Sequence, residues 1–177
     1  MQRILITGGS GFIGTNLIQS LLKNKCFVLN IDKLDHTSKF TNLFHPSNDK
    51  NNYIFKKLDI LETKKLSSLI NNFKPNLIFH LAAESHVDNS INNPKVFIES
   101  NIVGTFSLLE SVRRYLSKNN LKNFRLINIS TDEVYGSIVG KKKAFENSFY
   151  NPSSPYSASK ASSVHLCNAW VKTFDLP

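Results

Sequence analysis

Cysteine is scarce in this 177-residue sequence, which contains only Cys26 and Cys167. The two residues have neither the close spacing of metal ligands nor the density of a disulfide scaffold, so we expect buried thiols. The sequence also lacks an apolar run of about 18 residues, which excludes a membrane-spanning helix. Its first residues lack the basic start and cleavage site of a secretion signal. These absences predict a cytoplasmic protein with neither a metal site nor a membrane segment.

Acidic residues are also few, because 13 Asp and Glu face 22 Lys and Arg, for a net charge of +9. An excess of positive charge is typical of nucleic-acid-binding proteins. The tight basic cluster at 141–143, however, lacks the interleaved aromatic residues of a base-stacking platform. We therefore interpret the charge as a solvated surface that attracts anionic ligands, and expect no nucleic-acid partner. Hydrophobic residues at 41% and charged residues at 20% indicate one compact globular domain.

The stretch Arg3-Ile-Leu-Ile-Thr-Gly-Gly-Ser-Gly-Phe-Ile-Gly14 combines a short buried strand with a glycine-rich turn. Glycines at positions 8, 11 and 14 allow the backbone to approach a pyrophosphate closely, and the N-terminus of the following helix stabilises its charge. That helix carries an apolar face of Leu17, Leu21 and Leu22. The alternative is an ordinary strand–helix turn that happens to be rich in glycine.

A second apolar strand, Phe27–Ile31, ends in Asp32, which lies 18 positions after Gly14. An acidic residue at about this distance from a glycine turn accepts hydrogen bonds from an adenosine ribose. An ionised Asp32 would repel a 2′-phosphate. The pattern therefore favours NAD over NADP.

Strands and helices alternate along the rest of the chain. We expect strands over 53–59, 76–81 and 124–129, and helices over 61–73, 95–116 and from Pro155 to about Phe174. The segment 33–52 has no period and is interpreted as a loop beside the adenosine. This alternation predicts an α/β fold, a Rossmann-type doubly wound parallel sheet with strand order 3-2-1-4-5, truncated after about five strands. Residues 1–177 would form one NAD-binding domain whose last strand is an exposed edge.

The long helix expected over 95–116 is apolar on more than one face, because Phe97, Val103 and Leu108 lie off its main stripe. Such a helix needs more than one neighbour. Contact with a second copy of the chain and burial within the domain both account for the pattern.

Two pairs of residues near the end of the chain are candidates for proton transfer. Tyr156 and Lys160 lie four positions apart on one helix face, where an ammonium would lower the pKa of a phenol and produce a base for an alcohol proton. Asp132 and Glu133 follow a strand directly, and repulsion between neighbouring carboxylates splits their pKa values, as an acid–base pair requires. The alternatives are a surface Tyr–Lys pair and a solvated acidic turn.

The glycine turn and Tyr156-Ser-Ala-Ser-Lys160 resemble the extended short-chain dehydrogenases that act on nucleotide sugars. Three further motifs, at 82–88, 130–136 and 151–162, are similar to those of the dTDP-glucose 4,6-dehydratases, in the same order along the whole chain. The resemblance implies NAD-dependent conversion of dTDP-glucose to dTDP-4-dehydro-6-deoxyglucose with loss of water. Other members of the class, UDP-sugar dehydratases and nucleotide-sugar epimerases, and a non-catalytic NAD-binding fragment stay open as alternatives.

The resemblance also implies residue roles. Tyr156 would take the proton of the sugar 4-hydroxyl beside Lys160, Thr131 would hydrogen bond that oxygen, Glu133 would remove the C5 proton and Asp132 would protonate the leaving 6-hydroxyl. The sugar nucleotide would contact Ser85, His86, Asn101 and Thr131. Contacts with NAD are implied for Gly8, Gly11, Phe12, Ile13, Gly14, Asp32, Lys33, Asp59, Ile60, Leu81, Ala82, Ala83, Ser85, Ser100, Tyr156 and Lys160.

The sequence departs from the family at two helix positions and at its end. Ser100 stands where Thr is common, and Val164 stands where Asp is common. The later strands and the lobe that grips the nucleotide are absent, so these 177 residues alone are expected to be inactive. A homodimer is expected for the full-length protein.

Overall fold

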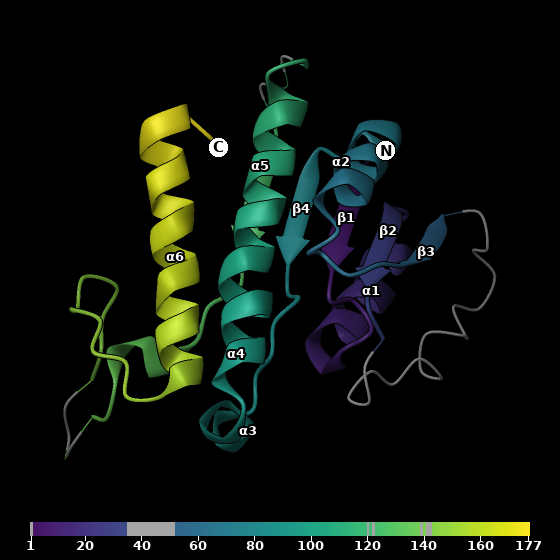
Figure 1. Ribbon diagram of the computed structural model, residues 1–177. Helices are drawn as coiled ribbons and strands as arrows, with labels where there is room; N and C mark the ends of the chain where they lie inside the picture. Colours follow the sequence, from purple (N-terminus) through teal and green to yellow (C-terminus); the bar gives the residue numbers. More distant parts are fainter. Residues whose placement is uncertain (1, 35–51, 120, 122, 139, 141–142) are drawn as a thin grey trace.

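The computed structural model describes residues 2–34, 52–119, 121, 123–138, 140 and 143–177, and Figure 1 shows their arrangement. Most of the expected loop at 33–52 lies outside the described residues. The elements are β1 (Arg3–Thr7), α1 (Phe12–Lys23), β2 (Phe27–Asp32), β3 (Tyr53–Lys57), α2 (Thr63–Phe73), β4 (Leu77–His80), α3 (Val87–Asn92), α4 (Pro94–Phe97), η2 (Ile98–Val103), α5 (Gly104–Leu116), β5 (Arg125–Asn128), η3 (Asp132–Tyr135) and α6 (Pro155–Phe174).

The five strands form one parallel sheet in the order β3-β2-β1-β4-β5, which confirms the predicted topology. In the central strand, Leu5 pairs with Leu29 on one side and with Ile78 on the other. All three side chains are buried, because a parallel sheet is covered by helices on both faces. The carboxyl ends of all five strands therefore meet at one edge of the sheet.

Alternation along β1 divides the core into two clusters. Leu5 points to the face covered by α2 and α5, where it packs in a cluster with Leu66, Ile70 and Leu108. Its neighbours on the strand point to the other face, which α1 covers, and that cluster consists of Ile4, Ile6, Ile18, Leu22, Cys26 and Val28. The buried face of α1 centres on Ile18, whereas the expected Leu17 and Leu21 pack at its margin.

The predicted helix over 95–116 is confirmed in its extent, because α4, η2 and α5 follow one another without a gap from Pro94 to Leu116. Its turns, however, are not all α-helical. A short helix α3 precedes it, and η2, a π-helical segment between α4 and α5, interrupts the regular turns. Phe97 and Leu108 are buried within the chain, as the burial interpretation required, whereas Val103 is 45% exposed. The π-helical turn shifts the phase of the stripe, so Phe106 is also 45% exposed although its spacing placed it on the buried face.

The edge strand β5 is partly covered. Its Ile127 side chain is 40% exposed, as expected for an edge. The Leu126 N–H, however, donates to the Pro177 carbonyl at 3.4 Å, and Leu176 is buried in the core cluster. The end of α6 and the residues after it thus lie against this edge.

The structure bears on two further expectations, one about the cysteines and one about membrane-spanning helices. Cys26 and Cys167 are both free thiols, the first buried and the second half-buried. Within the described residues, no helix has the length and apolar character that crossing a bilayer needs.

Candidate functional site

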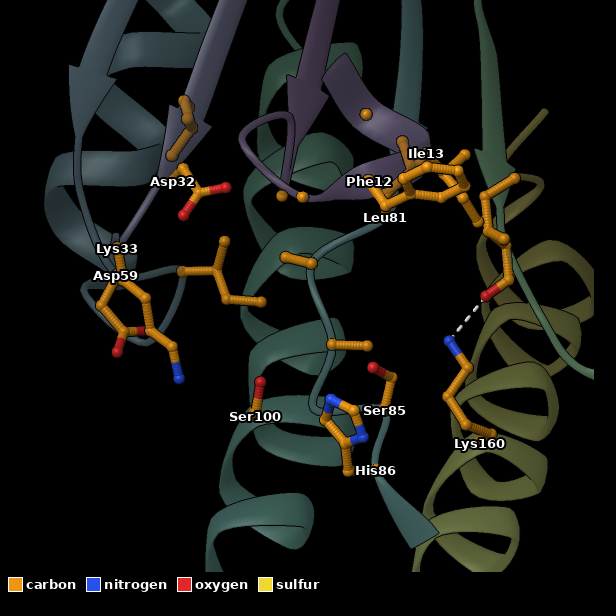
Figure 2. A pocket seen from close by; sticks show the side chains of 18 of the residues that line it. Phe12, Ile13, Asp32, Lys33, Asp59, Leu81, Ser85, His86, Ser100 and Lys160 are labelled. Atoms are coloured by element: carbon orange, nitrogen blue, oxygen red, sulfur yellow. Dashed lines mark hydrogen bonds between the residues drawn. The ribbon is translucent and has the colours of Figure 1, made fainter. Parts of the chain in front are cut away.

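A cavity of about 440 Å³ opens at the carboxyl edge of the sheet (Figure 2). Its walls come from the glycine turn after β1, the ends of β2 and β4, and the first turns of α6. Every residue implied to contact a cofactor lines this cavity, and so do Ser85 and His86. Four further lining residues were missed, although each directly adjoins an expected residue or a strand end: Ile31, Leu58, Ile129 and Ser130.

Glycine is required at position 8 for two separate reasons. Its φ is +72°, a conformation that L side chains rarely adopt, and a Cβ there would lie 2.5 Å from the Ala82 backbone nitrogen. A Cβ at Gly14 would lie 2.5 Å from the Gly9 Cα. The turn therefore presents bare backbone, and the first turn of α1 has no side-chain cap on its N–H groups. This is the arrangement that accommodates an anionic group.

We expect Gly8→Ala to lower the free energy of unfolding by about 2 kcal/mol more than Gly140→Ala does. Gly140 also has a positive φ, +74°, but a Cβ there would meet no atom within 4 Å. The control therefore measures backbone strain alone, whereas Gly8→Ala adds the clash with Ala82. Urea unfolding of the two variants checks this, and equal losses of stability would contradict the close approach.

Asp32 is fixed at the end of β2 with its carboxylate in the cavity wall. The side chain is 8% exposed, and it accepts hydrogen bonds from the Ser10 N–H at 2.9 Å and the Leu34 N–H at 2.8 Å. These bonds go to different carboxylate oxygens, so both oxygens are held at the end of β2 in the wall of the cavity.

The start of α6 is fixed by a capping box. The Ser154 side chain accepts from the Ser157 N–H at 3.0 Å, and the Ser157 side chain accepts from the Ser154 N–H at 2.9 Å. Pro155 occupies the first helical position, where its missing N–H costs nothing. This cap places Tyr156 in the first turn, at the cavity.

Tyr156 and Lys160 both line the cavity. The Lys160 ammonium, however, does not lower the pKa of the phenol, as their spacing on one helix face had suggested. Lys160 Nζ donates to the Ile129 carbonyl at 2.6 Å, as Figure 2 shows. Burial raises the pKa of Tyr156, a hydrogen bond with Thr131 opposes this rise, and the negative charges of Glu133 and Asp132 add to it. Burial lowers the pKa of Lys160 to about 8. The expectation of a phenol pKa lowered by Lys160 is therefore not met in this structure.

The acidic turn lies beside the cavity and not in its lining. Thr131 Oγ1 caps η3 by accepting from the Glu133 N–H, and it donates to Asp132 Oδ1, both at 3.3 Å. The same side chain lies close enough to Tyr156 to oppose the rise in the pKa of the phenol. The Thr131 hydroxyl thus contacts both acidic residues beside the phenol. Among the described residues, no group of His, Cys, Asp and Glu side chains could hold a metal ion.

Asn101 lies beneath the cavity, which corrects its expected contact with a substrate. Its side chain is 1% exposed and does not line the cavity. It accepts from the Glu84 N–H at 2.8 Å and donates to the Glu84 carbonyl and to Ser159 Oγ. Asn101 therefore joins the loop after β4 to helix α6.

A buried histidine joins further parts of the site. His80 contacts Thr7 Oγ1 through Nδ1 at 2.7 Å and Thr105 Oγ1 through Nε2 at 3.0 Å. Because Thr105 Oγ1 donates its own proton to the Asn101 carbonyl, Nε2 must carry the ring proton and Nδ1 must accept from Thr7. Burial, and to a smaller extent the charge of Lys160, lower the pKa of His80 to about 3. The ring is therefore neutral.

Comparison with known proteins agrees with this geometry. The sequence model described as GDP-mannose 4,6 dehydratase matches residues 5–177. The dTDP-glucose 4,6-dehydratase of Haemophilus influenzae is 46% identical over 182 residues, which cover 100% of this chain and 54% of that protein. The probable dTDP-glucose 4,6-dehydratase of Sinorhizobium fredii is 44% identical, with 99% of this chain and 51% of that protein covered. The chain thus spans about half the length of the curated relatives it matches.

Solved structures share the same architecture. The dTDP-glucose 4,6-dehydratase of Streptomyces venezuelae, with NAD and TYD bound, has a TM-score of 0.89 and 35% identity over 99% of this chain and 53% of its own. The UDP-glucose 4-epimerase of Thermus thermophilus, in complex with NAD, has a TM-score of 0.85 and 30% identity over 99% and 52%. Sequence and fold together place this chain in the GDP-mannose 4,6-dehydratase family.

Proposed function

We propose that residues 1–177 are the NAD-binding domain of a dTDP-glucose 4,6-dehydratase, which converts dTDP-glucose to dTDP-4-dehydro-6-deoxyglucose and water. The observation that carries this proposal is the single cavity that unites the glycine turn, Asp32 and the Tyr156–Lys160 pair. The curated relatives from Haemophilus influenzae and Sinorhizobium fredii carry this activity in their names.

The residues of the cavity fit NAD. The bare backbone at Gly8 and Gly14 leaves room for a pyrophosphate, and the carboxylate of Asp32, which lies in the wall of the cavity, suits ribose hydroxyls. Asp59 and Ile60 line the wall where the adenine would lie. When bound, NAD supplies a reversible hydride acceptor for the oxidation at C4 and the reduction at C6 of the sugar.

Tyr156 is proposed as the base that removes the proton of the sugar 4-hydroxyl. The proximity of Thr131 supports this role, because a hydroxyl beside the phenol can orient the same substrate oxygen. Lys160 lies in the wall of the cavity with its charge near the strand end. Its proposed part is to hold the ribose and to favour a deprotonated phenol once the substrate is present.

The elimination of water is assigned to the acidic turn. A ketone at C4 acidifies the C5 proton, which Glu133 takes, while Asp132 gives a proton to the 6-hydroxyl as it leaves as water. The shared hydroxyl of Thr131 supports this pairing, because it holds both residues in one short turn beside Tyr156. Ser85 and His86, on the lining of the cavity, are proposed to contact the sugar nucleotide.

A nucleotide-sugar 4-epimerase is the second candidate, because the epimerase from Thermus thermophilus shares the fold and 30% identity. Epimerisation at C4 eliminates no water and needs no acid–base pair beside Tyr156. The adjacent Asp132 and Glu133 therefore favour the dehydratase.

Incubation of the native polypeptide that carries this chain with dTDP-glucose and with UDP-glucose tests the proposal. We expect turnover of dTDP-glucose to a product that has lost one water, detected by mass spectrometry. A second protein, in which residues 1–177 replace the matching half of the Haemophilus influenzae enzyme, gives the same readout. Turnover of UDP-glucose alone by the native polypeptide would contradict the substrate, and C4 epimerisation without loss of water would contradict the reaction.

A homodimer is proposed from the exposed side of the helices that follow β4. Ile98, Val103 and Phe106 are each 45% exposed or more, and the Phe106 ring lies 5.8 Å from the Trp170 ring of α6. An apolar face of this kind on two neighbouring helices supports contact with a second copy. Location in the cytoplasm stays a prediction of the sequence.

A further inference from the structure

Lys33, the residue after Asp32, forms an ion pair with Glu84, which follows a different strand. Lys33 Nζ donates to Glu84 Oε1 at 2.5 Å, and the two side chains are 36% and 20% exposed. Lys33 comes directly after β2, whereas Glu84 belongs to the loop after β4, and β1 lies between those strands. The pair therefore joins the loop after β4 to the strand end that carries Asp32. Lys33 lines the cavity and Glu84 does not, and Figure 2 shows Asp32 and Lys33 on the same side of the cavity.

The backbone of Glu84 is held in place by the side chain of Asn101. Its N–H donates to Asn101 Oδ1 at 2.8 Å, and its carbonyl accepts from Asn101 Nδ2 at 3.0 Å. Asn101 is buried and also donates to Ser159 Oγ at 2.8 Å. Both polar groups of the Glu84 backbone are thus fixed on a rigid neighbour. The carboxylate is consequently preorganised to meet Lys33.

We propose that Glu84 determines the choice between NAD and NADP by neutralising Lys33, an inference that rests on the NAD site proposed above. NADP differs from NAD by a 2′-phosphate on the adenosine ribose. Asp32 repels this phosphate, but the flexible ammonium of the next residue would attract it and offset the repulsion. Because Glu84 binds that ammonium, its carboxylate offsets the positive charge that Lys33 would otherwise offer to the phosphate.

The test is the ratio of the dissociation constants for NADP and NAD, measured by calorimetric titration of the purified chain. We expect Glu84→Gln to lower this ratio about tenfold, because removal of the Glu84 carboxylate makes the charge around Lys33 less negative and strengthens the attraction of its ammonium for the phosphate. Glu62→Gln is the matched control. Glu62 forms an ion pair of the same length, 2.5 Å, with Lys65, and neither residue lines the cavity. This control should leave the ratio unchanged.

A second variant and a salt series show whether Lys33 is the cause. In the Glu84→Gln background, Lys33→Met should abolish the gain in NADP affinity, and about 0.5 M salt should reduce it. An unchanged ratio in Glu84→Gln, with NAD still bound, would overturn this inference and leave the NAD site intact. Failure of the unaltered chain to bind NAD would instead overturn the proposed function.

Discussion

Replacing Tyr156 with phenylalanine is expected to lower kcat for dTDP-glucose by about 10²–10⁴-fold, the usual contribution of a positioned proton-transfer group. The substitution removes only the phenol oxygen. The ring is 9% exposed and packs edge-on against Phe97 with 6.2 Å between centroids, so phenylalanine should keep the same position. NAD should still bind, because the glycine turn and Asp32 are untouched.

Steady-state kinetics on the native polypeptide, with NAD affinity measured in parallel, check this expectation. Tyr115→Phe is the matched control, because it removes another buried phenol oxygen, one that donates to the Pro75 carbonyl at 3.0 Å. Tyr115 does not line the cavity, and its loss should reduce stability by about 1 kcal/mol without changing kcat. A kcat for Tyr156→Phe within tenfold of the parent would contradict the proposed role.

Mild acid is expected to destabilise the chain through His80. The pKa of this ring is about 3 in the folded protein and has its ordinary value near 6.5 in the unfolded chain. The unfolded chain therefore binds one more proton between these values. The contribution of the neutral His80 ring to the free energy of unfolding is fully present above pH 6.5. It is lost as the pH falls toward 3, by about 1.4 kcal/mol for each pH unit.

Urea unfolding at pH 7 and at pH 4.5 measures this loss, and variants separate it from the titration of carboxyl groups. His80→Gln keeps an amide donor near Thr105 but cannot gain a proton, so its stability should fall less between the two pH values, although it starts lower. His86→Gln, which changes an exposed histidine, should keep the pH dependence of the parent. The same slope in His80→Gln as in the parent would contradict the prediction.

The sequence predicts the sheet well because its signals are local and redundant. The continuous apolar run at 76–81 reflects a strand covered on both faces, and Leu5, Leu29 and Ile78 do meet across three strands. The glycine turn is equally local. At Gly8, both the positive φ and the contact with Ala82 exclude a side chain. The presence of glycine in the sequence therefore indicates the backbone geometry at this position.

The contacts of long side chains are not predictable in this way. The spacing of Tyr156 and Lys160 places them on one helix face, but the ammonium reaches the Ile129 carbonyl, whose position depends on how β5 packs against α6. Asn101 likewise has the chemistry of a ligand-binding residue. Its amide is instead used by the backbone of Glu84, and nothing in the local sequence signals this partner.

The π-helical segment η2 makes the length of this part of the chain as important as its residues. A π-helical turn contains one residue more than an α-helical turn, so Asn101 is in register with Glu84 while Leu108 stays in the core. Removal of a single residue between 98 and 103 would restore the regular helix and rotate everything before it by about 100° relative to α5. In this family, an alignment gap at that point would separate proteins that keep the Asn101–Glu84 connection from proteins that have lost it.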